Sequence, residues 1–177
     1  MPENRENKNP YRWVILAVFA LVNLTIQIMW ICYAPISTLA MDYYGVSQLQ
    51  VGMLAMIFMI VYIPISIPVS WLIDTLGYRK AVSIGVIIMG VFGLLRAFAA
   101  SNFGLVMAAT VGIAIAQPFL LNAVSTVAGR WFPIQERATA SGLALVASFI
   151  GIAVGQVVSP ILTLNYGIPT MLMVKDG

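Results

Sequence analysis

The sequence predicts an all-α membrane protein with five transmembrane helices, and its composition and the spacing of its charges support this fold class. Hydrophobic residues make up 61% and charged residues 8% of the 177 residues, and the mean hydropathy is +0.97. A soluble domain with a single core cannot shield that much apolar surface from water. Because a spanning helix needs about 20 apolar residues, the chain has room for five or six spans.

The same composition argues against several other classes of protein. The formal charge of +3 is explained by basic residues in loops, so we expect no nucleic-acid partner. The chain has no histidine, and its one cysteine, Cys32, lies inside an apolar run. We therefore expect neither an internal disulfide nor a metal site. The sequence shows no nucleophile–base arrangement and no glycine-rich phosphate loop, so we expect no enzyme activity and no cofactor.

The first two spans follow a polar segment, residues 1–12, which we expect to form a cytoplasmic tail. The first span, 13–34, carries no charge, and Pro35 ends or kinks it. The second span, 51–73, contains two prolines, which membranes tolerate where neighbouring helices satisfy the freed carbonyls. These two runs predict a pair of helices that cross the bilayer.

The third and fourth spans are expected at 81–100 and 103–128. Arg96, in the third, is the only charged residue inside any of the five spans. Its guanidinium either extends to the membrane interface or forms a substrate or gating contact, and the sequence leaves both readings open.

The fifth span, 138–164, has small residues at every fourth position, which form a stripe that lets another helix approach closely: Ala147, Gly151, Gly155 and Ser159. Residues 165–177 are polar enough to leave the bilayer, and we expect them to form an extracytoplasmic segment with no sixth apolar run after it.

The basic residues predict the orientation of the chain in the membrane. With the amino terminus inside the cell, seven of the nine fall on the cytoplasmic side: Arg5, Lys8, Arg12, Arg79, Lys80, Arg130 and Arg137. Only Arg96 and Lys175 do not. Because cytoplasmic loops are rich in Lys and Arg, we expect this orientation, in the plasma membrane.

The turn between the second and third spans carries a recognisable motif. It resembles the signature loop of major facilitator superfamily transporters, which has Gly, three residues, Asp, two residues, Gly, one residue and two basic residues. Four positions match: Asp74, Gly77, Arg79 and Lys80. Two depart from the pattern, because Ser70 stands where the family usually has Gly and Thr75 where a basic residue often follows the Asp.

This resemblance implies a larger molecule, with twelve helices in two six-helix bundles, each an inverted pair of three-helix repeats. The chain would supply five helices of the amino-terminal bundle and stop before the sixth. Its partners would be the lipid bilayer, a small-molecule substrate and the missing carboxy-terminal bundle. In the family the loop Asp holds the two bundles together on the cytoplasmic side, a role that falls here on Asp74.

Uncommon polar residues within the spans are the candidates for a substrate site. Asn23, Gln27 and Trp30 are spaced i, i+4 and i+7, so they share one helical face. Gln117 lies near the middle of the fourth span, beside a proline. Each of the four has an alternative structural role, in which the amides bond neighbouring helices and the indole fills the core. Asn122 is expected to bond helix to helix.

A narrower resemblance links the chain to the feline leukaemia virus subgroup C receptor-related branch of the superfamily. It rests on segments that include Trp-Ile-Cys-Tyr-Ala-Pro-Ile at 30–36 and Ala-Gln-Pro-Phe-Leu-Leu at 116–121. Animal members of that branch are linked to choline and ethanolamine uptake and to haem export. The resemblance implies a choline pocket lined by Trp30, Gln117 and Met59, and an aromatic face does attract a quaternary ammonium.

Three functions remain open from the sequence. The leading hypothesis is a secondary transporter that moves a small organic solute, such as choline, by alternating access. A proton-coupled drug or anion antiporter is the second, although it needs a titratable group at mid-membrane that the five spans lack. The third is a non-transporting membrane scaffold subunit that binds partner helices through the small-residue stripe.

Overall fold

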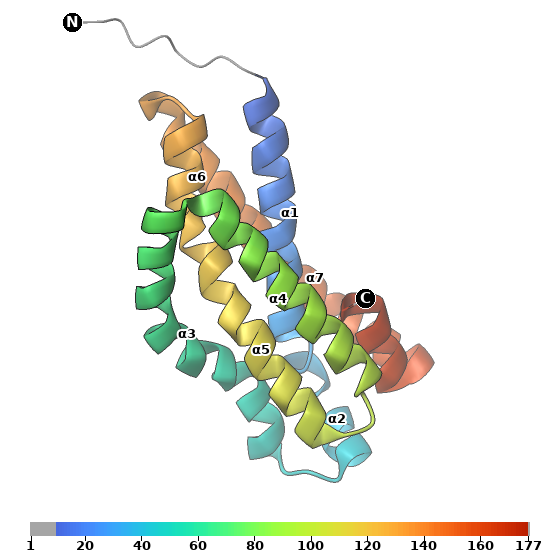
Figure 1. Cartoon of the computed structure of the whole chain (residues 1–177). Helices are drawn as coiled ribbons and strands as arrows, with labels where there is room; N and C mark the ends of the chain where they lie inside the picture. Colours follow the sequence, from blue (N-terminus) through green and yellow to red (C-terminus); the bar gives the residue numbers. More distant parts are fainter. Residues whose placement is uncertain (1–9, 177) are drawn as a thin grey trace, which may run out of the picture.

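The computed structural model describes residues 10–176 as a bundle of long helices (Figure 1). Five helical segments are long and apolar enough to cross a membrane: Tyr11–Tyr44, Gln48–Leu76, Tyr78–Phe98, Phe103–Trp131 and Ile134–Lys175. They follow the five predicted spans in order, and the described residues contain no strand. The predicted all-α class is confirmed. Most of the expected tail, residues 1–9, lies outside the described part of the chain.

The first span is broken near its end. Helix α1 (Tyr11–Ile31) is followed by the short 3-10 helix η1 (Ala34–Ile36) and by α2 (Ser37–Tyr44). Pro35 lies in the first turn of η1, where it has no N–H to continue the α-helical ladder. Gly45 then ends α2 in the left-handed conformation, with φ of 64°. The predicted break at this proline is therefore present.

Helices α3 (Gln48–Leu76) and α4 (Tyr78–Phe98) are joined by a single residue, Gly77. Its φ of 84° lies in the region that favours glycine, which is the role that the sequence predicts for it. Helix α3 also contains two prolines, and it changes direction along its length (Figure 1), as proline kinks do.

The fourth span consists of two helices. Helix α5 (Phe103–Leu121) ends at Asn122, and α6 (Ala123–Trp131) begins directly after it. Asn122 N donates to Pro118 O at 3.0 Å. Helix α5 is the central element of the bundle, packed against both α3 and α4, and most of its side chains are buried.

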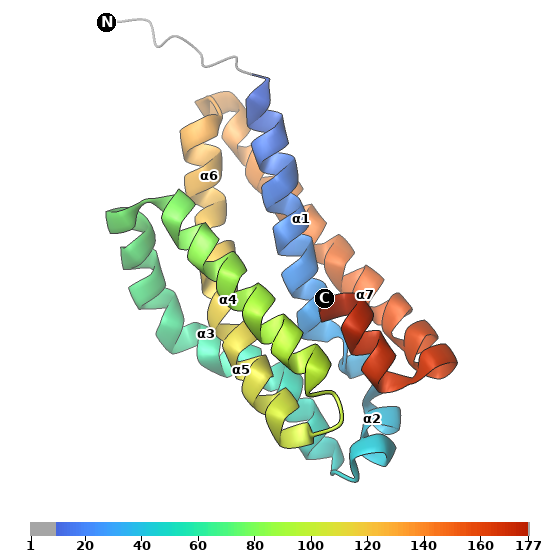
Figure 2. The same ribbon diagram turned by 45° about the vertical axis from the view of Figure 1, so that its right-hand side comes forward.

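Helix α7 (Ile134–Asp176) is broken at Gly167, which has φ of 82° and ψ of 168°. The segment after this residue turns back beside the end of α7 (Figure 2), where Lys175 Nζ donates to Gly155 O at 3.3 Å. The sequence predicts that residues 165–177 leave the bilayer, which stays a prediction, and in the structure residues 168–176 are helical and packed on the bundle. The reason is a short apolar face of buried side chains: Ile168, Met171 and Leu172.

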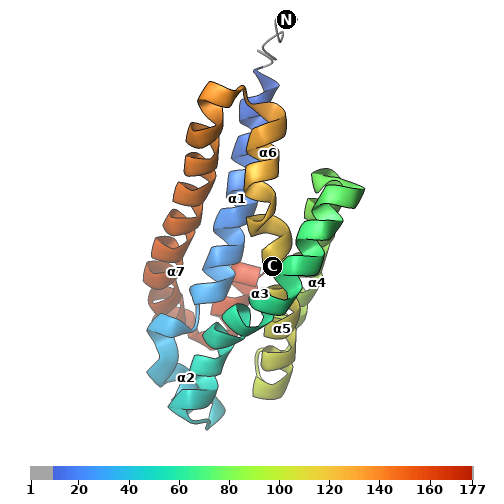
Figure 3. The ribbon, with the colours of Figure 1, turned by 90° about the vertical axis from the view of Figure 1, so that its left-hand side faces the viewer.

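Helices α1 and α7 lie side by side (Figure 3) and make the most extensive helix contact among the described residues. A Cβ atom on Gly151 would lie 2.4 Å from Leu24 O, and one on Gly155 would lie 2.4 Å from Ile31 Cγ2. The small-residue stripe therefore faces α1 of the same chain. It does what the sequence predicts, since it lets two backbones approach closely.

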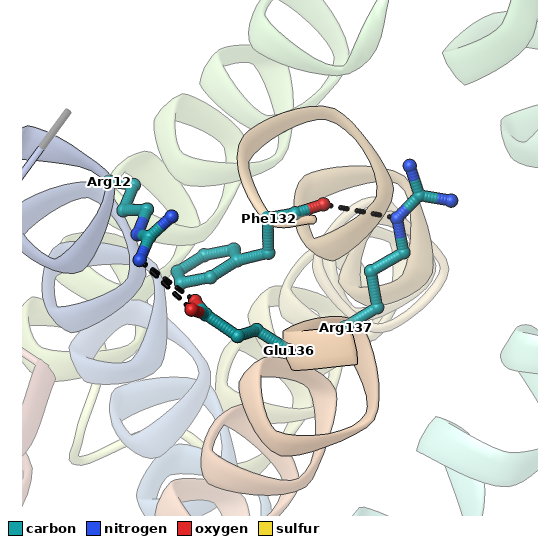
Figure 4. Close-up of polar contacts among 4 residues, drawn as sticks. All are labelled: Arg12, Phe132, Glu136 and Arg137. Carbon is teal, nitrogen blue, oxygen red and sulfur yellow. Dashed lines mark hydrogen bonds and ion pairs between the residues drawn. The ribbon is translucent and has the colours of Figure 1, made fainter. Parts of the chain in front are cut away.

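The amino-terminal end of α1, the α3–α4 turn and the α6–α7 loop all lie at one end of the bundle (Figure 1). A network of side chains joins α1 to the α6–α7 loop there (Figure 4). Arg12 Nη2 lies 3.1 Å and 3.0 Å from the two carboxylate oxygens of Glu136. The Trp13 and Phe132 rings meet edge to face at 5.1 Å, and Arg137 Nε donates to Phe132 O at 3.1 Å. The amino-terminal end of the first span is thus tied to the start of the fifth.

Candidate substrate site and signature loop

The polar face of α1 points into the protein, as predicted. Asn23 is fully buried and Gln27 nearly so. Asn23 Nδ2 donates to Phe19 O, one turn earlier in the same helix, at 2.9 Å. Within the described part of the chain, Oδ1 of Asn23 and Oε1 of Gln27 are buried without a hydrogen-bond partner. A buried acceptor without a partner costs about 1–3 kcal/mol, so a donor from a bound molecule would stabilise this face.

Trp30 is half-buried and anchored to a second helix. Its indole Nε1 donates to Ala55 O of α3 at 3.1 Å. Met59 follows Ala55 by one turn on the same helix, and its side chain is 67% exposed. Trp30 is therefore fixed to α3 one helical turn before Met59, and its indole cannot rotate away without losing this hydrogen bond.

Gln117 lies on α5, 7% exposed. Its neighbour Ala116 belongs to a buried cluster in the middle of the bundle that also contains Phe58, and Trp30 packs against that cluster. Helices α1, α3 and α5 thus meet at the level of the predicted pocket. Among residues 10–176, no recorded hydrogen bond joins any two of the five predicted substrate residues: Asn23, Gln27, Trp30, Met59 and Gln117.

The Arg96 side chain turns into the protein and does not reach its surface, so it does not extend along the outside of the bundle. It is 1% exposed, the largest of the fully buried side chains, and its Nη1 donates to Met29 O of α1 at 3.1 Å. Cys32 Sγ reaches the same carbonyl at 3.3 Å. The carbonyls in the last turn of a helix lack partners within the helix, and the broken end of α1 supplies one to this guanidinium.

Asn122 bonds one helix to another, as predicted. Tyr62 of α3 donates to Asn122 Oδ1 at 2.7 Å. The amide nitrogen of Asn122 donates to Ser66 Oγ at 2.9 Å and to Ser70 Oγ at 3.0 Å. The polar residue at the break between α5 and α6 therefore fixes α3 beside it.

The signature loop has an aromatic centre that sequence reasoning missed. Asp74, Arg79 and Lys80 are exposed, whereas Tyr78 is buried. The Tyr78 hydroxyl accepts hydrogen bonds from Arg79 Nε, at 3.2 Å, and from Trp131 Nε1 at the end of α6. This shared acceptor ties the α3–α4 turn to the α6–α7 loop. The sequence signal that could have revealed this centre is a tyrosine next to two basic residues at the membrane interface.

Comparison with known proteins agrees with these features. The profile of the Major Facilitator Superfamily matches residues 19–174. The choline/ethanolamine transporter FLVCR2 of Rattus norvegicus is 33% identical over 156 residues, which are 87% of this chain and 29% of that protein. FLVCR1 of Mus musculus, also a choline/ethanolamine transporter, is 33% identical over 87% of this chain and 28% of its own length.

A third relative carries a more general name. Solute carrier family 49 member A3 of Xenopus tropicalis is 30% identical over 84% of this chain and 33% of its own length. The chain thus spans about a third or less of each of these relatives. The five apolar helices, the signature loop and the match over most of the sequence lead to one conclusion: this chain is an integral membrane protein that belongs to the Major Facilitator Superfamily.

Proposed function

We propose that the intact protein is a secondary transporter that moves a small organic cation, choline or a related compound, across the plasma membrane by alternating access. The choline/ethanolamine transporters among its relatives support this solute class. The distribution of basic residues supports a cytoplasmic amino terminus, and the α3–α4 turn and α6–α7 loop do lie at one end of the bundle (Figure 1).

The proposed substrate site is neutral and lies where α1, α3 and α5 meet. The single observation that carries it is the half-buried indole of Trp30, which donates to Ala55 O of α3, one helical turn before Met59. An aromatic face attracts a desolvated quaternary ammonium by about 2 kcal/mol or more. Gln117 on α5 and the acceptor oxygens of Asn23 and Gln27 would then accept hydrogen bonds from a substrate hydroxyl or amine.

The rest of the transporter would come from further chain. Alternating access needs a second bundle that rocks against the first, and we assign the exposed Asp74 the contact with it on the cytoplasmic side. We also propose that residues 168–176 begin a sixth helix. A groove of about 870 Å³ between α1 and α4, lined mostly by apolar side chains such as Val18 and Val86, would receive it.

Choline uptake by cells that express the intact protein tests the proposal. Trp30→Ala should abolish saturable uptake, because the cation–π contact is lost, and Trp30→Phe should retain part of it, because a smaller aromatic face remains. Trp71→Ala is the matched control, since Trp71 is 65% exposed on α3 and lies outside the proposed site. Normal uptake by Trp30→Ala at equal surface expression would remove Trp30 from the site.

A further inference from the structure

A pocket of about 460 Å³ lies where the α3–α4 turn meets the end of α6. Seven residues line it: Leu76, Gly77, Tyr78, Arg79, Lys80, Arg130 and Trp131. Three of them are cationic, and none of the seven is acidic. The pocket is therefore a concentration of positive charge in a hollow, at the end of the bundle that carries most of the basic residues.

Aromatic rings hold the two arginines in place. The Arg79 guanidinium lies 5.5 Å from the centre of the Trp131 ring, and its Nε donates to the Tyr78 hydroxyl. The Arg130 guanidinium lies 5.7 Å from the centre of the Tyr78 ring. A guanidinium that lies over a ring can still donate from its remaining N–H groups to carboxylate or phosphate oxygens. The arrangement thus places two arginine side chains in the lining of one pocket.

No carboxylate neutralises these cations within residues 10–176. The ion pair between described side chains at this end of the bundle joins Arg12 to Glu136, outside the pocket, and Asp74 is not among the residues that line it. Like charges gathered in one pocket repel one another, and an anion that binds there relieves the repulsion through charge-assisted hydrogen bonds.

The pocket also lies at the level expected for the membrane interface. It is formed by the ends of three membrane spans, where tyrosine and tryptophan mark the interface and where basic residues meet the headgroups of the cytoplasmic leaflet. We propose that this pocket binds the phosphate group of an anionic phospholipid headgroup. Arg79, Arg130 and Lys80 contact the phosphate, and Trp131 lies at the level of the lipid glycerol.

The test compares lipids on the purified intact protein. Thermal unfolding is measured in nanodiscs of phosphatidylcholine alone and of phosphatidylcholine with increasing phosphatidylglycerol. We expect saturable stabilisation by phosphatidylglycerol. Arg79→Gln and Arg130→Gln should each raise the phosphatidylglycerol concentration needed for half of the effect by about fivefold or more, the effect of one basic residue at a charged membrane surface. Arg137→Gln is the matched control, because it removes an exposed arginine at the same end but outside the pocket.

Three results would overturn the proposal. The first is equal stability in both lipid mixtures. The second is a loss of the effect in Arg137→Gln as large as in the two pocket variants, which would indicate general surface charge. The third is full stabilisation by millimolar inorganic phosphate in phosphatidylcholine nanodiscs, which would show that the site takes a free anion and not a lipid. Substrate uptake is not part of the readout, so the result is independent of the proposed transport function.

Discussion

The contact between α1 and α7 makes a quantitative prediction about one glycine. A Cβ atom added to Gly151 would lie 2.4 Å from Leu24 O and 3.0 Å from both the carbonyl carbon and the Cα of Leu24. All three are backbone atoms, so no side-chain rotation can make room. Ordinary van der Waals contact begins about 1 Å farther out, and α7 must therefore move away from α1 by about that distance.

The expected cost follows from this displacement. Overpacking of a close interface by a single methyl group costs about 1–3 kcal/mol. Gly142→Ala is the matched control, because Gly142 lies on the same helix with nothing within 4 Å of an added Cβ. Both variants gain about 1 kcal/mol of helix propensity. The difference between them isolates the clash.

Thermal unfolding of the purified intact protein in detergent measures that difference. The midpoint shift for each kcal/mol falls as the chain lengthens and is about 1 °C for a protein three times as long as this chain, so Gly151→Ala should unfold at least about 1 °C below Gly142→Ala. Equal midpoints for the two variants would refute the packing of α7 on α1. Equal midpoints would instead favour the scaffold-subunit hypothesis, in which the small-residue stripe binds a helix of another protein.

Two further substitutions test the polar contacts inside the bundle, each by the same unfolding assay. Arg96→Ala removes a fully buried side chain and the donor to Met29 O. It should cost about 2–4 kcal/mol. The exposed Arg137→Gln, which loses one hydrogen bond to Phe132 O, should cost only about 1 kcal/mol, and equal losses would contradict the buried contact. Asn122→Ala removes the bonds to Tyr62, Ser66 and Ser70 and should cost about 2 kcal/mol, at about 0.6 kcal/mol for each interhelical bond in a membrane. Tyr62→Phe removes one of them and should cost about a third as much, and an equal cost for both variants would argue against the shared network.

The five spans could be predicted because hydropathy is a local property. Each apolar run is long enough to cross the bilayer by itself, and each is bounded by charged or turn-forming residues. Gly77 forms the predicted turn and Pro35 the predicted helix break, because positive φ and a missing N–H are properties of single residues. The small-residue stripe could also be predicted, because its four-residue period is visible within one segment of the sequence.

Features that depend on a distant partner could not be predicted. Arg96 was recognised as unusual, but its acceptor is the carbonyl of Met29, 67 residues away. The turn at Gly167 was missed because residues 168–176 form too short an apolar face to register as a span. In the sequence Tyr78 looks like any interfacial tyrosine. Only the structure shows that Arg79 and Trp131 both donate hydrogen bonds to its hydroxyl.

The candidate substrate site was predicted only in part. The face with Asn23 and Gln27 was identified from helical spacing, and both side chains are buried. The family resemblance assigned Met59 and Trp30 to one pocket, and the structure joins Trp30 to α3 at Ala55 O, one turn before Met59. The binding roles of all five residues stay predictions, because the spacing of a single helix does not show which residues of three helices share a pocket.

The central claim is that five helices cross the membrane with the α3–α4 turn and the α6–α7 loop on the cytoplasmic side. Labelling of single cysteines tests it most directly, in an intact protein whose native cysteines, Cys32 among them, are replaced by serine. The positions are Lys80, Arg137 and Tyr43, whose side chains are exposed. A membrane-impermeant maleimide applied to intact cells should label Tyr43→Cys, and should label Lys80→Cys and Arg137→Cys only after the cells are permeabilised. Labelling of either loop cysteine in intact cells would contradict the account.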